Sequence, residues 1–339
     1  MITIKKVAQL AGVSTATVSR VINNSGYVNG KTRDTVESIM REYHYVPLDS
    51  AVNLSKQESS TIGIVIPEID NVFYSEILHG ISEVADENGL SPIIFDTQNN
   101  AEKEARALRL ISRQRVRGLL LAPAVDYAKT SLGKELKDIL TDLQIPVVIV
   151  DREADGISWD SVFYQNYESS FAVAEALYHA GGRRMAVITG DLKLKIGRDR
   201  LNGFAAGLKL TGLKLRKDDI YEGNFLEPMA YELSRKMLMK RSLPDAVYTC
   251  NNRTSLGFLK AAGELGIQVG KDIGLMGNDS LRILDELGIP FSCAYRDTAE
   301  MGRIALRLLL KRIDHPDDPR EIYRMPFSIA LRGSEKKLS

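Results

Sequence analysis

The 339-residue sequence contains few of the residues that build disulfide frameworks and metal sites. Its two cysteines, Cys250 and Cys293, lie inside apolar stretches without C-x-x-C spacing, so we interpret both as buried free thiols. The four histidines are scattered without ligand spacing; they are His44, His79, His179 and His315. These absences exclude a disulfide scaffold, and we expect no metal site.

Signatures of common enzyme classes are also missing. No G-x-G-x-x-G follows the first predicted strand, and there is no G-x-S-x-G and no Walker lysine loop. We therefore predict that the protein is not an enzyme and has neither a catalytic residue nor a cofactor. No apolar run approaches the roughly 18–20 residues that span a bilayer, and the first residues lack the apolar core of a secretion signal. The chain is expected to stay in the cytoplasm.

Acidic residues are absent from the first 33 positions. This stretch carries a charge of +5, which leaves −4 of the total of +1 for the other 306 residues. Its basic residues are Lys5, Lys6, Arg20, Lys31 and Arg33. A basic segment attracts phosphate backbones through counterion release, although short basic termini are also common. The charge pattern by itself therefore leaves nucleic-acid binding open.

Helical periodicity predicts three short helices in residues 1–46, which we assign to one domain. Thr3 precedes a first amphipathic run that ends at Gly12, and Ser14 is a suitable N-cap for a second helix over about 15–23. So short a glycine-containing turn between two helices is typical of a helix-turn-helix unit. A third helix is expected over about 31–43, with a buried face that comprises Val36, Ile39, Met40 and Tyr43.

Residues 47–60 are mostly small and polar and are interpreted as a hinge or linker. After them, seven apolar segments alternate with helical ones, which indicates parallel sheets covered on both faces. The predicted strands span 61–67, 91–96, 118–122, 146–151, 184–190, 245–251 and 273–278, and the helices lie near 74–89, 101–115, 132–143, 167–181, 198–211, 228–241 and 253–266. These units are too many for one small sheet, so we expect two Rossmann-like lobes with ligand chemistry at the strand ends that face the cleft between them.

The head and later segments resemble the LacI/GalR family of repressors. The head motif is TIKKVAQLAGVSTATVSRVIN (3–23), followed by KTR (31–33) and YVP (45–47). Further landmarks follow in order: NVFYSEILHGI (71–81), PVVIVDR (146–152), GGRRMAVITG (181–190), RLNGF (200–204), NNRTSLG (251–257), GLMGND (274–279) and AEMGRIALRLLLKRI (299–313). The resemblance implies a homodimer on palindromic operator DNA, a hinge helix that folds on that DNA, and a body that resembles periplasmic sugar-binding proteins and switches when an effector binds.

The predicted fold is thus a small all-α helix-turn-helix head plus an α/β body of two lobes. We place the head at 1–46 and the hinge at 47–60. The N-terminal lobe is predicted to contain 61–161 and 292–321, and the C-terminal lobe 162–291 and 322–339.

In the head, the resemblance places Thr15, Ala16 and Arg20 at base edges. An arginine can hold O6 and N7 of guanine in bidentate fashion, whereas threonine and alanine suit looser contacts such as a thymine methyl. Hydroxyl and amide side chains mainly fix the register on phosphates. The residues implied for that role are Thr3, Ser14, Thr17, Ser19, Asn23, Tyr27 and Thr32. A solvated surface arginine is the alternative for Arg20.

The hinge departs from the family pattern Pro-Asn-x-x-Ala-Arg-x-Leu. This chain reads Pro-Leu-Asp-Ser-Ala-Val-Asn-Leu over 47–54, so Leu48 and Val52 replace the usual polar residue and cation. Leu54 is retained and is the candidate for an apolar wedge that enters the minor groove and kinks the duplex. Ordinary dimer packing is the alternative for Leu54.

Polar residues at predicted strand ends are the candidates for an effector cleft, namely Asp151, Asn251 and Asp279. The resemblance adds Arg200, at the place of an effector-binding arginine, and Phe225, which matches an aromatic cover. The complete predicted set is Phe73, Asp151, Arg198, Arg200, Phe225, Asn251, Asp279 and Arg296. Carboxylates and amides bond vicinal hydroxyls while aromatic faces cover C–H surface, so such a pocket suits a sugar. Helix caps, surface ion pairs and core packing are the alternatives.

Two other functions stay open. A solute-binding protein that feeds a transporter would share the body, but the basic helical head argues against it. Within the regulators, a family member that responds to a nucleobase corepressor or to a partner protein is the second possibility.

Overall fold

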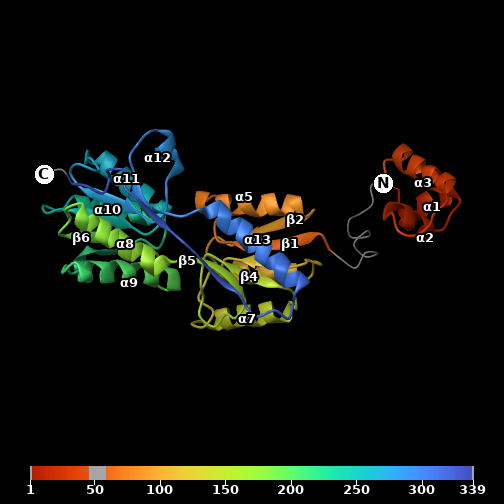
Figure 1. The fold of residues 1–339 in the computed structure, drawn as a ribbon, viewed down its shortest axis with the longest axis horizontal. Coiled ribbons are helices and arrows are strands. Elements are labelled where there is room, and N and C mark those ends of the chain that lie inside the picture. Colours follow the sequence, from red (N-terminus) through yellow and green to blue (C-terminus); the bar gives the residue numbers. More distant parts are fainter. Residues whose placement is uncertain (1, 46–58, 338–339) are drawn as a thin grey trace. The chain divides into compact units, whose positions relative to one another are not determined.

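The computed structural model describes residues 2–45 and 59–337, which form a small amino-terminal unit and a larger unit that begins at Ile62 (Figure 1). The predicted wedge Leu54 and most of the hinge at 47–60 lie outside the described residues. Within the described ranges, none of the helices has both the length and the apolar character that a membrane span requires.

The amino-terminal unit contains three helices, α1 (Ile4–Ala11), α2 (Thr15–Ile22) and α3 (Gly30–Glu42). Their caps explain their ends, because the Thr3 and Ser14 side chains accept from backbone N–H groups of the first turns. Gly12 terminates α1 in the left-handed region, with φ of 63°. The buried core comprises Val7, Ala8, Val18, Val21 and Val36. The three predicted helices are confirmed to within one residue at each end.

One predicted core residue of the head is wrong. Tyr43 follows the last residue of α3 and is 44% exposed. His44 then adopts a positive φ of 49°, and the chain turns so that Tyr45 packs against the core. The helical spacing alone could not show that the helix ends one residue before Tyr43.

The first lobe of the body is a six-stranded sheet in the order β11-β5-β4-β3-β1-β2. Its strands are β1 (Thr61–Ile66), β2 (Ser91–Asp96), β3 (Leu119–Leu121), β4 (Val147–Val150), β5 (Asp160–Tyr164) and β11 (Ile322–Met325). Its helices are α5 (Val72–Glu87), α6 (Ala101–Ile111), α7 (Ser131–Asp142) and α13 (Thr298–Asp314). A Cβ on Gly80 would lie 1.9 Å from the Ala299 carbonyl oxygen, so glycine lets α5 and α13 pack at backbone contact.

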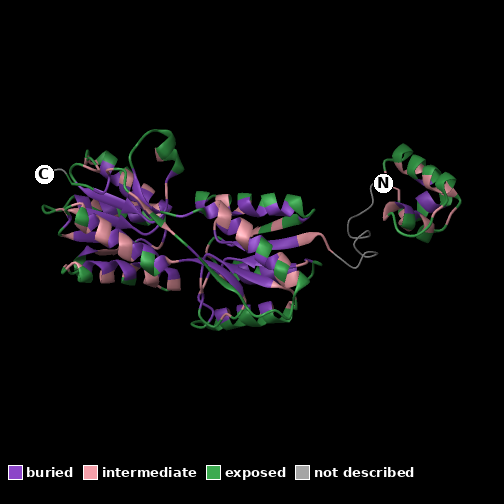
Figure 2. Cartoon of the chain, viewed as in Figure 1, coloured by how far each residue is buried: buried purple, intermediate pink, exposed green. Residues whose placement is uncertain are grey.

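The second lobe has the sheet order β12-β10-β9-β8-β6-β7. Its strands are β6 (Met185–Thr189), β7 (Ile220–Glu222), β8 (Ala246–Thr249), β9 (Gly274–Gly277), β10 (Ser292–Tyr295) and β12 (Ser328–Ala330), of which β12 runs antiparallel to β10. Its helices are α8 (Asn166–His179), α9 (Lys195–Leu210), α10 (Glu227–Leu238), α11 (Asn252–Glu264) and α12 (Arg282–Glu286), with a 3₁₀ turn at Lys217–Asp219. Figure 2 shows the central strands of both lobes buried beneath helices with exposed outer faces. The predicted two-lobed α/β body is confirmed.

The predicted lobe boundaries need three corrections. The boundary at 161/162 cuts β5, which belongs to the first sheet throughout. The first lobe does not include β10, because Ser292 pairs with Met276 of β9 in the second sheet. The second lobe does not include β11, because Ile322 pairs with Ser161 of β5. Sheet membership follows from pairing between distant strands, which local sequence patterns do not reveal.

Candidate functional site

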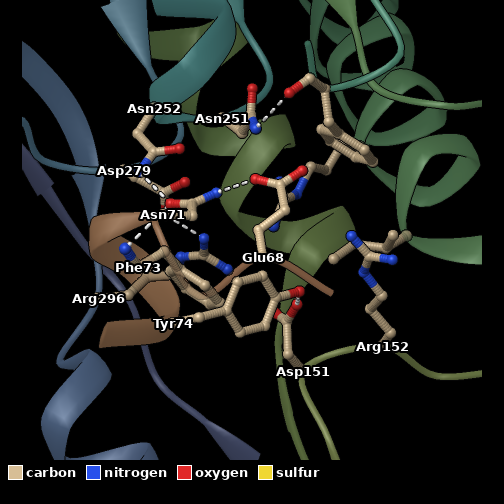
Figure 3. Close-up of a pocket in the computed structure, with 13 residues that line it drawn as sticks. Glu68, Asn71, Phe73, Tyr74, Asp151, Arg152, Asn251, Asn252, Asp279 and Arg296 are labelled. Atoms are coloured by element: carbon tan, nitrogen blue, oxygen red, sulfur yellow. Dashed lines mark hydrogen bonds and ion pairs between the residues drawn. The ribbon is translucent and has the colours of Figure 1, made fainter. Parts of the chain in front are cut away.

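A cavity with about 360 Å³ of empty space lies within the body, and residues of both lobes line it (Figure 3). The lining residues are Glu68, Asn71, Phe73, Tyr74, Asp151, Arg152, Ile196, Arg200, Phe225, Asn251, Asn252, Asp279 and Arg296. Seven of the eight predicted effector residues are among them. The exception is Arg198.

The strand ends explain why these side chains meet. Asp151 follows β4 of the first lobe directly, and Asn251 and Asp279 lie two residues beyond β8 and β9 of the second. Parallel strands present their carboxyl ends at one edge, where ligands bind in open α/β sheets. Arg296 lies in the connection from β10 to α13, which carries the chain from the second sheet back to the first lobe.

Arg296 is a buried cation with two kinds of support. Its Nη2 donates to Asp279 Oδ1, and its guanidinium carbon lies 4.9 Å from the Phe73 ring centre and 4.4 Å from that of Tyr164. Burial lowers the pKa of Arg296, but Asp279, Tyr164 and Asp151 together outweigh this effect and leave that pKa raised. Its Nε and Nη1 atoms are buried without a hydrogen-bond partner among the described residues. Two donor nitrogens therefore remain unused.

Asp151 supplies an unused acceptor. Its backbone has a φ of 63°, a region that residues other than glycine adopt at a cost. Oδ2 accepts a 2.9 Å hydrogen bond from the Tyr74 hydroxyl, while the buried Oδ1 has no partner among the described residues. Burial raises the pKa of Tyr74 well above its ordinary value, so the phenol stays protonated and donates. Asp151 is thus held in place with one carboxylate oxygen free.

Arg200, on α9, is only 2% exposed. Its Nε donates to Asn166 Oδ1 at 3.0 Å and its Nη1 donates to the Cys250 carbonyl. Burial, followed by the nearby charge of Arg296, lowers the pKa of Arg200. The guanidinium is therefore fixed in position within an environment that disfavours its charge.

Phe225 closes part of the cavity wall and also has a positive φ of 63°. Its ring centre lies 5.7 Å from the Arg200 guanidinium. A Cβ on Gly190 would lie 1.9 Å from Cζ of this ring, so the ring position requires glycine there. Asn251 caps α11 through Thr254 and donates to the Phe225 carbonyl at 3.3 Å. The cap alternative for Asn251 is therefore realised together with its place in the lining.

Arg198 points away from the cavity, which corrects its predicted placement. It lies two residues before Arg200 on α9, and a helix turns by about 200° over two residues. Its Nη2 instead lies 3.2 Å from Asp126 and 3.7 Å from Asp155, both in the first lobe. Arg198 is thus an ion-pair contact between the lobes.

Sequence reasoning missed six lining residues, namely Glu68, Asn71, Tyr74, Arg152, Ile196 and Asn252. Asn252 donates to Asn71 Oδ1 at 2.7 Å, a hydrogen bond that joins the two lobes at the cavity (Figure 3). Applying the strand-end rule to β1, and to the residue directly after Asp151 and Asn251, would have found Glu68, Arg152 and Asn252. Only the tertiary structure could reveal Ile196, because its side chain belongs to the apolar core of the second lobe.

The outward face of α2 presents the side chains predicted to read bases. Thr15, Ala16 and Arg20 are exposed, whereas Val18 on the opposite face is fully buried. Tyr27 is 90% exposed. Thr32 is half-buried near the start of α3.

The predicted phosphate contacts also have structural roles in the head. Thr3 caps α1, and the Ser14 hydroxyl caps α2 and lies 3.0 Å from that of Thr17. Asn23 Nδ2 donates to Ser19 Oγ at 3.2 Å. The Thr3, Ser14 and Thr17 hydroxyls are thus held at the amino-terminal ends of the two helices, and that of Ser19 is held near the carboxyl-terminal end of α2.

Comparison with known proteins decides the family. The model for bacterial regulatory proteins of the lacI family matches residues 3–48, and that for a periplasmic binding protein-like domain matches 174–335. The HTH-type transcriptional repressor PurR of Pasteurella multocida (strain Pm70) is 31% identical over 337 residues, which is 99% of each chain. The chain belongs to the lacI family. It is a DNA-binding transcriptional repressor of that family.

Other lacI-family members show the same arrangement. The ribose operon repressor of Haemophilus influenzae (strain ATCC 51907 / DSM 11121 / KW20 / Rd) is 29% identical over 318 residues, 94% of each chain. The lac repressor dimer bound to operator and the anti-inducer ONPF aligns with a TM-score of 0.84 at 26% identity, over 99% of both chains. These relatives are repressors rather than enzymes. The lacI-family resemblance and the predicted fold class are both confirmed.

Proposed function

We propose that this lacI-family repressor binds a palindromic operator as a homodimer in the cytoplasm, and that a sugar or sugar derivative in the interlobe cavity controls its operator affinity. One observation carries the effector proposal. Buried polar atoms without partners line the cavity from both sides: Asp151 Oδ1 is an acceptor, and Arg296 Nε and Nη1 are donors. Buried polar groups are rarely left unsatisfied, so a ligand is expected to satisfy them.

The chemistry of these atoms favours hydroxyl groups. A hydroxyl donates one hydrogen bond and accepts others, so a polyol can serve Asp151 and Arg296 together. Phe73 and Phe225 supply apolar faces for the C–H surface of a sugar ring. The proposed effector contacts are Phe73, Asp151, Arg200, Phe225, Asn251, Asp279 and Arg296.

On the DNA side, we propose that α2 enters the major groove. Thr15, Ala16 and Arg20 would then contact bases, and Leu54 of the hinge would enter the minor groove. The exposed face of α2 supports this assignment, since it combines one guanidinium with hydroxyl and methyl groups. The proposed phosphate contacts are Thr3, Ser14, Thr17, Ser19, Asn23, Tyr27 and Thr32.

A nucleobase corepressor is the second candidate. The aromatic faces of Phe73, Tyr74 and Phe225 in the lining favour it, because a flat heterocycle can stack on such faces. Its ring N–H groups and acceptor atoms would serve Asp151 and Arg296 as well, so the ligand screen distinguishes the two candidates.

A ligand screen tests the effector proposal. Thermal unfolding of the full chain is followed with sugars, sugar acids, sugar phosphates and nucleobases. A ligand at a hundredfold excess over its dissociation constant should stabilise the protein by about 2.7 kcal/mol. Each stabilising compound is then added to an operator complex followed by fluorescence anisotropy. A response to nucleobases alone would contradict the sugar proposal.

The position of Arg198 leads to one prediction. Arg198→Ala should change effector affinity less than tenfold, because Arg198 lies off the cavity and contacts Asp126 and Asp155 instead. Arg200→Ala, the matched variant two residues along the same helix, should lose tenfold or more. Calorimetric titration of both variants with the compound found in the screen measures the difference. Equal losses would show that the two side chains share one role.

Gly190 leads to a second prediction. Gly190→Ala should lower the free energy of unfolding by about 1–3 kcal/mol, because the new methyl group overlaps the Phe225 ring. The displaced ring should also weaken effector binding at least tenfold. The matched control is Gly263→Ala, in the last turn of the second lobe's α11, where an added Cβ meets nothing within 4 Å. Denaturant unfolding and calorimetry measure both effects, and unchanged values for Gly190→Ala would contradict the described ring position.

A further inference from the structure

Arg152 is a cavity residue to which neither the predictions nor the proposed hydroxyl contacts give a role. It is 6% exposed and follows Asp151 at the end of β4 (Figure 3). Its Nη1 donates to the Pro123 carbonyl at 3.2 Å. In the described part of the chain, no carboxylate lies within 4.0 Å of Arg152, so one neutral acceptor faces a full positive charge. Burial raises the pKa of the Glu104 carboxyl and the charge of Arg152 opposes that rise at longer range, but no described carboxylate is in contact with the guanidinium. Burial of a charge without an ion-pair partner is costly.

Two of the three guanidiniums that line the cavity have no carboxylate partner, although three acidic and three basic lining residues balance in total charge. Arg296 is paired with Asp279. Glu68 accepts hydrogen bonds from two asparagines and lies 3.7 Å from Arg253, whose closer partner is Asp70 at 2.9 Å. Arg152, Arg200 and Asp151 form no ion pair with another described residue.

Arg200 likewise lacks a carboxylate partner among the described residues. Its two described hydrogen bonds go to the amide oxygen of Asn166 and to the Cys250 carbonyl, both neutral acceptors. Burial and then the charge of Arg296 lower its pKa. A ligand that carried one negative charge would offset both effects, because an anionic oxygen strengthens each hydrogen bond that a guanidinium donates.

The remaining features limit the rest of the ligand. The free Asp151 Oδ1 can accept a hydrogen bond from a hydroxyl group of the ligand. Phe73 and Phe225 can pack against apolar C–H surface of the ligand. The empty space of about 360 Å³ includes adjoining solvent, so the enclosed part is smaller and suits a ligand no larger than one sugar ring.

We propose that the effector is a monosaccharide-sized polyhydroxy compound with one acid group, either a carboxylate or a phosphate, and that Arg152 selects for that group. The inference rests on the proposed function of the cavity as the effector site. It narrows the ligand class from sugars in general to sugar acids and sugar phosphates.

Matched pairs of compounds test the proposal by calorimetry on the full chain. The pairs are glucose with gluconate and glucose 6-phosphate, galactose with galacturonate, and ribose with ribose 5-phosphate. In the pair that binds, the acid should bind at least tenfold more tightly than its neutral partner. Arg152→Gln should abolish this preference while it leaves the neutral partner within threefold, since glutamine keeps a donor for the Pro123 carbonyl. A neutral partner that binds as tightly, or a preference that survives in Arg152→Gln, would overturn the proposal.

A second measurement does not depend on the correct choice of sugar. The midpoint of thermal unfolding is compared in inorganic phosphate and in chloride at equal ionic strength. Phosphate stabilises proteins in general, and this nonspecific rise in the unfolding midpoint is the same in every variant. A difference between variants in the rise therefore reports specific binding. The wild type and the control Arg282→Gln, whose side chain is 75% exposed, should gain more from phosphate than Arg152→Gln does. Equal gains in all three proteins would overturn the proposal.

The two proposals fail in different ways. Neutral sugars that bind and change operator affinity would support a sugar effector and overturn the acid group. Acids that bind through Arg152 without any change in operator affinity would support the acid-binding cavity and contradict its role as a control site.

Discussion

Replacing Asp279 with alanine is expected to abolish the effector response while operator binding persists. The substitution removes the carboxylate that pairs with Arg296, and it leaves a guanidinium that is 4% exposed without its partner. Loss of one member of a buried ion pair costs about 3–5 kcal/mol of folding stability. Loss of a buried polar contact costs about 1–3 kcal/mol in binding, which at about 1.4 kcal/mol per decade is tenfold to a hundredfold in effector affinity.

The readout is the operator affinity with and without effector. A ligand shifts an equilibrium only as far as it binds one conformation better than the other. The two affinities of Asp279→Ala, measured by fluorescence anisotropy, should therefore be equal. Normal effector affinity in this variant would show that the cavity is not the effector site.

A double variant separates ligand binding from stability. Asp279→Ala alone should unfold at a lower temperature than the wild type, because Arg296 is left as a buried unpaired charge. Asp279→Ala combined with Arg296→Met removes both charges and should recover most of that stability, since apolar replacements of buried pairs are often neutral or stabilising. The double variant should nevertheless remain unresponsive to effector. A recovered response would show that the pair acts through stability alone.

Replacing Arg20 with alanine is expected to abolish specific operator binding at the concentrations where the wild type binds. Arg20 is exposed on the outward face of α2, next to no carboxylate of the described head. Loss of a bidentate contact to guanine costs about 1–3 kcal/mol for each arginine. A dimer carries two such residues, so the combined loss is expected to reach a hundredfold or more.

The control for this prediction lies elsewhere on the head. Arg41 is exposed in the last turn of α3 and is assigned no base contact, so Arg41→Ala should retain sequence-specific binding. Both variants should keep wild-type effector affinity, since the substituted residues belong to a separate folded unit. Anisotropy with operator and with scrambled DNA measures specificity. Specific binding by Arg20→Ala at wild-type strength would refute the assignment of α2 as the recognition helix.

Local chemistry explains how much of the fold could be predicted. Thr3, Gly12 and Ser14 define the ends of the first two helices through caps that act within a few residues. Apolar runs indicated seven of the twelve strands that the structure describes in the two sheets. Of the five that were missed, β7, β11 and β12 are edge strands of three or four residues. The other two, β5 and β10, lie inside the sheets but contain Asp160, Ser161 and Ser292, which interrupt the apolar pattern.

For the candidate site too, local features could be predicted from the sequence, whereas features that depend on packing could not. Asp151, Asn251 and Asp279 were found because a strand end is a local feature whose direction in a parallel sheet is known. Arg198 and Arg200 could not be told apart, since the choice depends on how α9 is rotated against the sheet. Arg152 was missed because its proposed role depends on the lack of a carboxylate within ion-pair distance. That lack becomes visible only when the surroundings of the whole cavity are known.

The sequence by itself determined the helix-turn-helix head, the alternation of strands and helices, the family and most of the polar residues of the cavity. Each of these depends on caps, periodicity or motifs within a short stretch of chain. The tertiary structure alone decided which sheet β10 and β11 join, which face of α9 meets the cavity, and which buried charges lack a partner. These are relations between residues that are distant in sequence, and they are set by packing and by the balance of charge in a closed space.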